Sequence, residues 1–372
     1  MSPSIFAVVT GGGTSGHVIP ARAICEMLME AGYDRSDIAY VGSRRGVEQE
    51  LMSDNIVHSE FLPISGLQRS MTFRNVARNA ALPLRLFRSR VIARRLIRRW
   101  NPRVVVSVGG YASEPMSRAA IAAKIPLVCV SYDRIPGLAT KRQARRATAC
   151  AVAFDGSSLP RAVVTGAPVR KELRDVDVRS SRQTSRETLG IAQDASVVAI
   201  TGGSLGSDVL NSCASQILSL SHEAGIHNVV VYHVAGNRFV RSPMPHVPPG
   251  AQYIRVGYET NMKDLYAALD VLLCRAGAST VAEVATVGVP AVLVPWPGAA
   301  DNHQELNARW LTDVGGAVLA SDAGCADGTV AKTVVELLSD SSHRALLATT
   351  ARAMGERHRS GALAALIKSV AL

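Results

Sequence analysis

The stretch VVTGGGTSGHVIPARAICEML, residues 8–28, passes from an apolar run through a glycine-rich turn into residues with helical periodicity. Its glycines at positions 11, 13 and 16 satisfy the G-x-G-x-x-G spacing, in which a strand turns tightly into a helix. A helix N-terminus presents free backbone N–H groups and a positive dipole end, so it favours anions such as phosphates. The stretch therefore predicts a strand, a turn and a helix that open an α/β domain, with a phosphate-bearing ligand at the turn.

The spacing alone does not identify that ligand. A dinucleotide site of the NAD type also needs an acidic residue at the end of the second strand, where it holds the ribose. That position reads Ser43, Arg44 and Arg45, which disfavours NAD and leaves an NADP-dependent oxidoreductase open. The chain contains no Gly-Lys pair, which excludes a Walker P-loop.

His17 directly follows the glycines, at the start of the predicted helix. The positive helix end is expected to lower the pKa of this histidine and keep the imidazole neutral, able to accept a proton. His17 is therefore a candidate general base. A histidine that only caps or packs the helix fits the same pattern.

Length and composition limit the class of protein. A chain of 372 residues is long for one hydrophobic core and suits two domains. The sequence shows no run of 18 apolar residues and no secretory signal, so neither a transmembrane helix nor export is expected. The six cysteines have no C-x-x-C spacing and mostly lie in apolar surroundings, which predicts reduced, buried thiols in a cytoplasmic protein.

The net charge of +11 originates in one part of the chain. Residues 61–113 contain eleven arginines, no lysine and no acidic residue, and the rest of the chain is balanced. Apolar residues alternate with these arginines in the arginine-rich segment, residues 69–103. This pattern suits an anionic membrane surface, and it equally suits a packed helix with a solvated arginine face. Nucleic acid is not expected as a partner, because no recognisable nucleic-acid module accompanies the charge.

Short β-branched runs alternate with helical stretches, which is typical of parallel sheets covered by helices. One series of expected strands covers residues 5–10, 38–41, 104–108, 127–130 and 151–153. A second series covers residues 197–201, 229–234, 252–256, 271–273 and 291–295. The charged segment between the two series predicts a domain boundary near residues 165–170.

A strand that ends in glycine and enters a helix recurs along the chain. It appears in VVTGGGTSGH (8–17), VVSVGGYASEP (105–115) and VAITGGSLGS (198–207), and with a single glycine in VLLCRAGASTVAEV (271–284). Ligands bind outside the carboxyl ends of the strands in open α/β sheets. Glycine turns in both halves of the chain therefore predict one ligand cleft between two domains.

Several motifs occur together in a fixed order: GGGTSGHVIPARAI (11–24), PISGLQR (63–69), VGGYASEP (108–115), GLATK (137–141), TGAPVR (165–170), TGGSLGS (201–207), CRAGASTVAEV (274–284) and ADNHQELNA (300–308). Over almost the whole chain they resemble the MurG family of UDP-N-acetylglucosamine transferases, a branch of the GT-B glycosyltransferases. The resemblance implies an α/β fold of two Rossmann-like domains whose parallel sheets face each other across a cleft. It places an acceptor-binding, membrane-facing domain at residues 1–165, a UDP-sugar-binding domain at 166–345, and a C-terminal helix at 346–372 that returns to the first domain.

The resemblance also implies an activity. A hexosamine, most simply N-acetylglucosamine, would pass with inversion from a UDP-sugar to an isoprenoid-phosphate glycolipid at the inner face of the cell membrane. The UDP-sugar would be a substrate, and no metal or other cofactor would be required. One Asp-x-Asp sequence, residues 175–177, is of the kind that holds a metal in other glycosyltransferases, but it lies in a charged linker and is interpreted as a chance match.

Site residues follow from the same resemblance. Those expected to bind the donor are Arg170, Ser204, Leu205, Gly206, Ser279, Thr280, Glu283, Asn302 and Gln304. Among them, Ser204 to Gly206 and Arg170 would hold the diphosphate, Glu283 the ribose hydroxyls, and Asn302 and Gln304 the sugar. Two alternatives remain: Thr280 and Glu283 also have the spacing of a helix capping box, and Arg170 would equally serve as a solvated linker residue.

The acceptor side combines family residues with departures from the family. His17 is the expected base, and the residues expected to line the acceptor are Thr14, Ser15, Gly16, Tyr111, Ser113 and Asp133. The family's His-Glu-Gln-Asn after the fifth strand reads Val-Ser-Tyr-Asp at 130–133, and the second loop carries Glu114, Met116, Ser117 and Arg118 in place of small residues. These departures favour a specialised phosphoglycolipid acceptor, as in antibiotic assembly, over lipid I. A non-catalytic module that binds a nucleotide-sugar is the remaining alternative.

Overall fold

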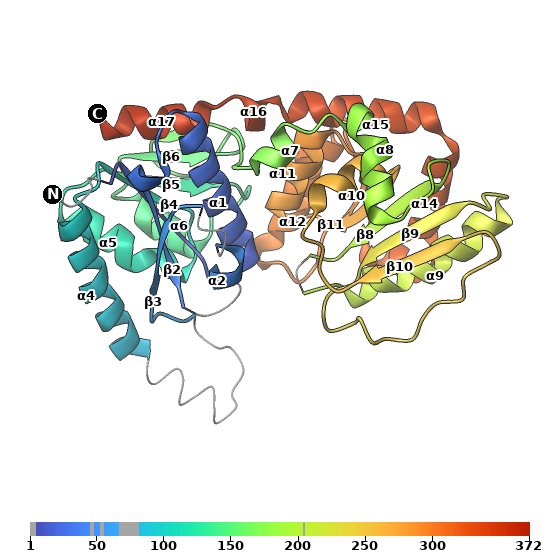
Figure 1. The fold of residues 1–372 in the computed structure, drawn as a ribbon, viewed down its shortest axis with the longest axis horizontal. Coiled ribbons are helices and arrows are strands. Elements are labelled where there is room, and N and C mark those ends of the chain that lie inside the picture. The colour runs from blue at the N-terminus through green and yellow to red at the C-terminus, as the bar shows by residue number, and fades with distance from the viewer. Residues whose placement is uncertain (1–4, 45–47, 53–55, 67–81, 204) are drawn as a thin grey trace. The chain divides into compact units, whose positions relative to one another are not determined.

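The structure is a computed structural model that describes residues 5–44, 48–52, 56–66, 82–203 and 205–372 (Figure 1). Its contacts divide the chain into two units, Met1–Lys171 with Arg357–Leu372, and Glu172–Glu356. The helix expected over 346–372 is therefore interrupted. Helix α15 (Ser341–Met354) packs on α11 (Ala278–Val287) in the second unit, and only α17 (Ala362–Ala371) packs on α1 (Ser15–Glu30) in the first.

The first unit is a parallel sheet in the strand order β3-β2-β1-β4-β5-β6-β7. The strands are β1 (Ala7–Thr10), β2 (Ile38–Ser43), β3 (His58–Leu62), β4 (Val104–Ser107), β5 (Leu127–Ser131), β6 (Ala149–Val152) and β7 (Ala162–Val164). Besides α1 and α17, its helices are η1 (Arg35–Asp37), α2 (Glu48–Leu51), α4 (Leu82–Trp100), η2 (Tyr111–Ser113), α5 (Glu114–Ala122) and α6 (Leu138–Ala144). Two short helices lie at the unit boundaries, α7 (Lys171–Arg174) and α16 (Glu356–Arg359).

The second unit is also a parallel sheet, in the order β10-β9-β8-β11-β12-β13. Its strands are β8 (Ser196–Thr201), β9 (Val229–Val234), β10 (Gln252–Val256), β11 (Val271–Arg275), β12 (Ala291–Val294) and β13 (Val318–Leu319). Its helices, with α11 and α15, are α8 (Val178–Leu189), α9 (Asp208–Glu223), α10 (Met262–Ala268), η3 (Ala300–Asn302), α12 (His303–Thr312), α13 (Asp322–Ala326) and α14 (Thr329–Ser339).

Every strand expected from the β-branched runs is present, with ends that differ by a few residues. The central strands are buried on both faces, as in β4 and β12, which explains why they read as continuous apolar runs. Strands β3 and β7 were not predicted. Each lies at an edge of the first sheet: β3 is only partly buried and carries polar residues, whereas β7 is an exposed run of only three residues, AVV. The two-residue β13, at an edge of the second sheet, was not predicted either.

Both sheets place their glycine turns at the point where the strand order reverses. Strand β1 lies between β2 and β4, and strand β8 lies between β9 and β11. The four glycine turns of the sequence follow β1, β4, β8 and β11. They therefore lie in pairs at the switch point of each sheet, where open α/β sheets bind their ligands.

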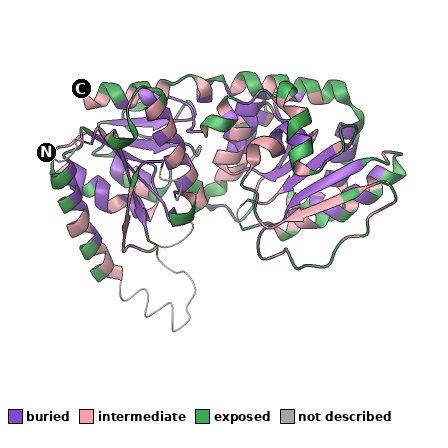
Figure 2. Cartoon of the chain, viewed as in Figure 1, coloured by how far each residue is buried: buried purple, intermediate pink, exposed green. Residues whose placement is uncertain are grey.

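Helix α4 contains most of the arginine-rich segment and packs through one stripe of residues. Its buried residues are Ser89, Ala93, Leu96, Ile97 and Trp100, a helical spacing that faces the core, and its outer face is exposed (Figure 2). The guanidinium of Arg90 forms an ion pair with Glu114 at the start of α5. Glu114 therefore fixes α4 to the unit and is engaged within the protein.

No helix within the described part of the chain is long and apolar enough to cross a membrane. The six cysteines are all buried and free, which confirms the prediction of unpaired thiols.

Candidate functional site

The first glycine loop, residues 11–16, is packed closely on both sides. A Cβ on Gly12 would overlap the Glu48 carboxylate, and a Cβ on Gly13 would overlap the Tyr111 ring. Both glycines have a positive φ, so their conformation and their surroundings exclude a side chain. The loop glycines are thus required for close packing around the start of α1.

The Gly13 amide is not free for a ligand. Its N–H donates to Oε1 of the fully buried Glu48, and the second oxygen of that carboxylate accepts from Ser43 N–H. The Gly13 amide is therefore engaged within the protein. The first-turn amides of α1, at Ser15 and Gly16, lie at the helix N-terminus and are the groups suited to an anion.

His17 lies between the two glycine loops of the first unit. Its Nδ1 is 3.1 Å from Oγ1 of Thr14, the N-cap residue of α1. A Cβ on Gly110 would lie 3.4 Å from its Cδ2, and one on Gly109 would lie 3.8 Å from its Nε2. The half-buried imidazole is therefore held against the second glycine loop, residues 109–113.

The pKa of His17 is lowered, in the direction expected from the sequence but for a different reason. Burial of the ring is the larger cause, and the charge of Asp133 raises the pKa by less. The imidazole is therefore neutral at pH 7 and able to accept a proton.

The segment after β5 also reaches the first glycine loop. The Tyr132 hydroxyl donates to the carbonyl oxygen of Gly16, and the Tyr132 and His17 ring centroids are 6.5 Å apart. Asp133 is half-buried and acts electrostatically on His17. The structure therefore brings together the expected base and the part of the chain that departs from the family.

The second glycine loop is held by a buried polar network. Ser113 is fully buried; its hydroxyl donates to the carbonyl oxygen of Gly110 at 3.0 Å and accepts from Nε2 of Gln143 at 2.9 Å. Oε1 of Gln143 accepts from the hydroxyls of Ser107 and Ser117. Ser113 thus holds the second glycine loop through its hydrogen bonds, while the Tyr111 ring packs on Gly13 of the first glycine loop. Contact of either residue with an acceptor stays a prediction.

In the second unit, the loop that is expected to hold the diphosphate, residues 202–207 and called the diphosphate loop for that reason, leads from β8 into α9. Ser204 lies outside the described residues. Leu205 is exposed, and Gly206 packs so closely on the carbonyl oxygen of Ala235 that a Cβ would not fit. Ser207 is the N-cap residue of α9, and its hydroxyl accepts from Leu210 N–H. The loop therefore ends at a helix N-terminus of the kind that binds phosphate groups.

Arg275 supports this loop, a role that the sequence interpretation missed. Its Nε and Nη2 donate to the Ser207 hydroxyl at 3.1 and 2.8 Å, and it forms an ion pair with Asp322. Its Nη1 also donates to the carbonyl oxygens of Val294 and Pro295 at 3.3 Å. One guanidinium thus joins the ends of β11 and β12 to the start of α9. Its position as the last residue of a buried strand, two residues before Gly277, was the available signal.

Glu283 lies in the second turn of α11, and its Oε2 accepts a hydrogen bond from the buried Tyr266 hydroxyl at 2.9 Å. The helix begins at Ala278 after Gly277, so Ser279 and Thr280 are within its first turn. Thr280 is therefore not the N-cap residue, and the alternative interpretation of Glu283 as part of a capping box is wrong. Glu283 is thus a half-buried carboxylate close to this switch point, and its contact with a ligand stays a prediction.

The segment expected to contact the sugar is strained. Asp301 and Asn302 are consecutive non-glycine residues with φ of 54° and 51°, a left-handed conformation that costs free energy and is common at binding sites. Oε1 of Gln304 accepts from Trp296 N–H at 2.9 Å, and the Asn302 amide donates to Glu305 at 2.7 Å. No described residue accepts a hydrogen bond from Nε2 of Gln304. The two N–H groups on this nitrogen are therefore left for a ligand.

Arg170 belongs to the first unit, unlike the other expected donor residues. Asp177 is the N-cap residue of α8 and accepts from the N–H groups of Arg179 and Ser180 at 3.0 and 3.5 Å. The Asp-x-Asp sequence therefore has a structural role. Within the described ranges, no three His, Cys, Asp or Glu side chains are grouped to hold a metal ion.

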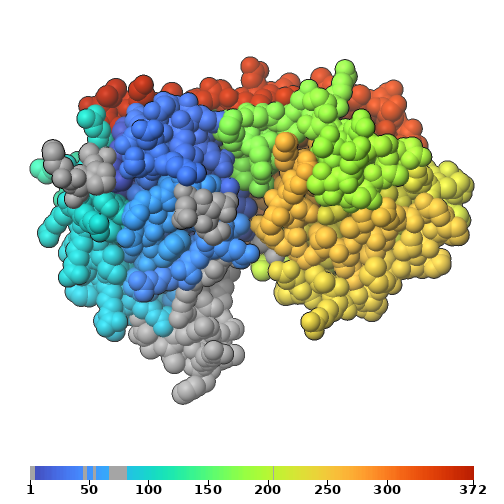
Figure 3. All heavy atoms as spheres, in the orientation of Figure 1, coloured from blue at the N-terminus to red at the C-terminus, as the bar shows by residue number. Residues whose placement is uncertain are grey.

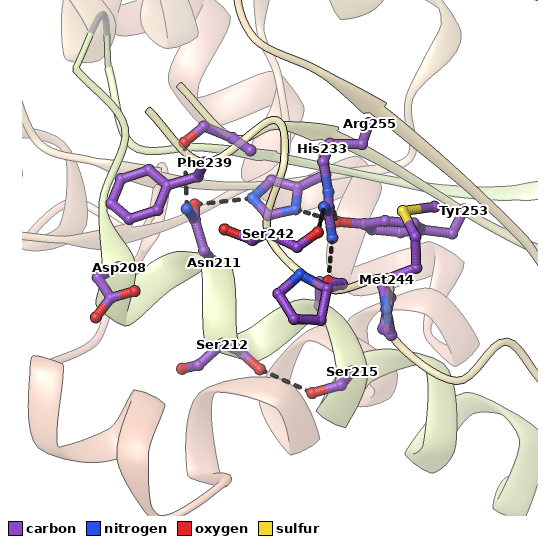
Figure 4. Close-up of a pocket in the computed structure, with 14 residues that line it drawn as sticks. Asp208, Asn211, Ser212, Ser215, His233, Phe239, Ser242, Met244, Tyr253 and Arg255 are labelled. Atoms are coloured by element: carbon purple, nitrogen blue, oxygen red, sulfur yellow. Dashed lines mark hydrogen bonds between the residues drawn. The ribbon is translucent and has the colours of Figure 1, made fainter. Parts of the chain in front are cut away.

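A pocket of about 250 Å³ lies beside α9, and its lining includes neither Gln304 nor Glu283 (Figure 4). Several of the polar side chains that line it are hydrogen-bonded to one another. His233 Nδ1 is 2.7 Å from the Tyr253 hydroxyl and Nε2 is 2.8 Å from Asn211 Oδ1. Burial and the nearby Arg255 lower the pKa of His233 to about 4. Arg255 itself donates to Tyr253 and to the carbonyl oxygens of Ser242 and Pro243. His233 is thus a neutral histidine with a structural role in this pocket.

Comparisons of the chain with known protein families, sequences and structures agree with this architecture. The chain matches the glycosyltransferase family 28 N-terminal domain over residues 7–152 and the C-terminal domain of the same family over residues 197–363. Two relatives are named UDP-N-acetylglucosamine--N-acetylmuramyl-(pentapeptide) pyrophosphoryl-undecaprenol N-acetylglucosamine transferase. The one from Mycobacterium sp. (strain KMS) is 35% identical over 97% of this chain and 94% of its own length. The one from Acidothermus cellulolyticus is 34% identical over 99% of this chain and 98% of its own length.

A crystal structure of MurG from Acinetobacter baumannii superimposes with a TM-score of 0.71 at 25% identity, covering 99% of this chain and all of that one. The two parallel sheets with glycine turns at their switch points define a GT-B glycosyltransferase. The chain belongs to glycosyltransferase family 28, and its curated relatives place it among the MurG-like UDP-sugar transferases.

Proposed function

We propose that this protein transfers N-acetylglucosamine from UDP-N-acetylglucosamine, with inversion, to the sugar of an isoprenoid-diphosphate glycolipid. The observation that carries the proposal is the neutral His17, held at a helix N-terminus between two glycine loops in a chain of this family. The relatives' names supply the donor and the class of acceptor.

His17 is proposed as the base. In the tautomer that suits this role, its Nδ1–H donates to Oγ1 of Thr14, which leaves the lone pair of Nε2 for the proton of the acceptor hydroxyl. The acceptor oxygen then forms a bond to the anomeric carbon of the sugar as the bond from that carbon to the UDP oxygen breaks. This single displacement inverts the configuration, so an α-linked donor gives a β-glycoside. The first-turn amides of α1 are suited to the acceptor's diphosphate.

The departing UDP carries negative charge that the protein must stabilise. The N-terminus of α9, anchored by Ser207 and Arg275, supplies aligned amides for the diphosphate. We propose that Ser204, Leu205, Gly206 and Arg170 complete this site, with Ser279 and Thr280 at the start of α11. A metal ion would then be unnecessary, and transfer should continue in excess EDTA at the rate measured without it.

The acceptor is the part of the proposal where a second candidate has support. Tyr132 and Asp133 occupy the neighbourhood of His17 in a segment that departs from the family's His-Glu-Gln-Asn. This difference favours a specialised phosphoglycolipid over lipid I. In that case Asp133 would contact the acceptor or orient His17.

Mass spectrometry of reaction products tests the proposal. The purified protein is incubated with UDP-N-acetylglucosamine and either a lipid I analogue or a lipid extract of the source cells. A lipid product heavier by one N-acetylhexosamine, with a β-linkage by NMR, supports transfer, and the acceptor that reacts identifies the candidate. UDP binding without turnover on any acceptor would indicate a non-catalytic module. Thermal stabilisation by NADPH but not by UDP would contradict both.

We further propose that α4 binds the anionic inner face of the cell membrane, as a peripheral contact. Helix α4 lies at the surface of the first unit (Figures 1 and 3). Its exposed residues include Arg94, Arg95, Arg98 and Arg99, and the apolar side chains of Leu84 and Phe87 are 55% and 64% exposed. Exposed arginines beside exposed apolar side chains are typical of helices that lie on anionic lipid. Residues 69–81 of the arginine-rich segment lie outside the described residues.

Replacement of Arg94, Arg95, Arg98 and Arg99 by glutamine is expected to weaken binding to anionic liposomes at least about tenfold, because each arginine near the surface contributes about 1 kcal/mol. Sedimentation with vesicles of phosphatidylglycerol and phosphatidylcholine measures this, and added salt should weaken wild-type binding. The control is Arg179→Gln with Arg241→Gln, two exposed arginines of the second unit. Equal binding of all variants would contradict the membrane proposal.

A further inference from the structure

Glu48 is a buried carboxylate that the proposed reaction leaves without a role. It is fully buried at the start of α2, and its two oxygens accept from Gly13 N–H and Ser43 N–H, at the ends of β1 and β2. The Tyr40 hydroxyl is 3.4 Å from Oε2 and donates to the carbonyl oxygen of Gly11 at 2.7 Å. The carboxylate therefore contacts the first glycine loop at the place where a dinucleotide fold would bind its ligand's diphosphate.

We infer that Glu48 is a positioning residue: its carboxylate acts as an internal anion that fixes the first glycine loop and thereby the start of α1 and His17. The inference rests on the proposed function, in which His17 is the base. By occupying the Gly13 amide, Glu48 also prevents this loop from taking up an external pyrophosphate in the manner of a dinucleotide site.

The geometry links Glu48 to His17 through a short, closely packed path. Gly13, held by Glu48, directly precedes Thr14, which is the N-cap residue of α1 and contacts His17 Nδ1. On its other side the loop is fixed by Tyr111 and by Gly110, where a Cβ would lie 2.5 Å from the carbonyl oxygen of Gly12. Without the Glu48 carboxylate, the first glycine loop would keep only its contacts with Tyr111 and Gly110.

Burial of the ionised Glu48 carboxylate costs free energy, which fits a positioning role. Burial raises its pKa to about 7, because its hydrogen bonds from Ser43, Gly13 and Tyr40 offset only part of the lost solvation. The titratable group in contact with it is Tyr40 on β2, which interacts in turn with Cys25 on α1 and Tyr111 on η2. Burial raises the pKa of Tyr40 and of Cys25, so both are neutral at pH 7. Arg22 on α1 pairs with Glu26.

The raised pKa of Glu48 determines how its contribution to stability changes with pH. The folded state binds the Glu48 proton more tightly than the unfolded state, so this residue lowers stability as the pH rises from about 5 through 7. The ionised form, present above pH 7, is the one that accepts from both Gly13 and Ser43. Activity that depends on the fixed loop should therefore rise over the same range in which this contribution to stability falls.

The test compares Glu48→Gln and Glu48→Ala with the wild type. The control is Glu60→Gln on β3, a carboxylate that forms an ion pair with the exposed His58 among the described residues. We expect kcat to fall about tenfold or more in both Glu48 variants while UDP affinity is unchanged. Formate or acetate should restore activity to Glu48→Ala by filling the vacated anion site, and formamide, which is neutral, should not. In Glu48→Gln, kcat should no longer rise with pH near 7. The melting temperature of this variant should also no longer decrease between pH 5 and 8.

The outcomes separate this inference from the proposed function. An active wild type with Glu48 variants of equal kcat, or equal restoration by formate and formamide, would overturn the positioning role. An inactive wild type that binds UDP would instead contradict the transferase proposal. If Glu48→Ala does not fold, the pH profiles of kcat and melting temperature in Glu48→Gln decide, and profiles identical to the wild type would overturn the inference.

Discussion

Replacement of His17 by alanine is expected to lower kcat by about 10²–10⁴-fold, the usual contribution of a general base, while UDP binds with wild-type affinity. The reason is that His17 belongs to the first unit and the diphosphate loop to the second. Its lowered pKa keeps the imidazole neutral at pH 7. Steady-state kinetics and calorimetric titration with UDP measure the two quantities separately.

The pH dependence of kcat provides a second test of the role of His17. Because the pKa of His17 lies below 6.5, protonation of the base should reduce kcat only below that pH, on the acid side of the limb assigned to Glu48 near pH 7. Glu48→Gln should leave the lower limb in place. A variant of His17 that loses turnover and UDP binding to the same extent would show that this histidine is structural.

Replacement of Glu283 by alanine is expected to weaken UDP binding by about 1–3 kcal/mol, the scale of hydrogen bonds to a charged group. The carboxylate is half-buried in the second turn of α11, and Tyr266 holds one of its oxygens. Two acceptor oxygens suit the paired ribose hydroxyls. Wild-type protein should therefore bind UDP more tightly than 2′-deoxy-UDP, and Glu283→Ala should lose this preference.

Tyr266→Phe is the control for the Glu283 substitution, since it removes the internal hydrogen bond and keeps the carboxylate. It should retain the preference for UDP over 2′-deoxy-UDP. If Glu283→Ala bound both nucleotides as the wild type does, Glu283 would only be the partner of Tyr266.

The buried central strands could be predicted because their sequences report burial directly. Runs such as VVVS in β4 and AVLV in β12 are apolar on both faces, and the glycines that follow strands at the switch points mark the ligand edge of each sheet. The edge strands β3 and β7 could not be predicted in this way. An edge strand is half exposed, so HSEFL in β3 carries polar residues where a central strand would be apolar.

The residues that support the site were harder to predict than those proposed to touch a ligand. Glu48 contacts Gly13 across 35 positions of sequence, and its own segment is polar and resembles a loop. Arg275 reaches Asp322 and Ser207 only because the strand order brings them to one edge. The capping-box interpretation of Glu283 failed because the N-cap residue of α11 is Gly277, three residues before Thr280.

The burial of all six cysteines has a practical consequence for labelling. A thiol reacts through its exposed thiolate, and burial raises the pKa of Cys25 and Cys274 and shields their sulfur atoms from reagents. A cysteine introduced at an exposed position of each unit would thus be modified ahead of the native ones. Spin labels or fluorophores attached there would report the separation of the two units during turnover, with every native cysteine left in place.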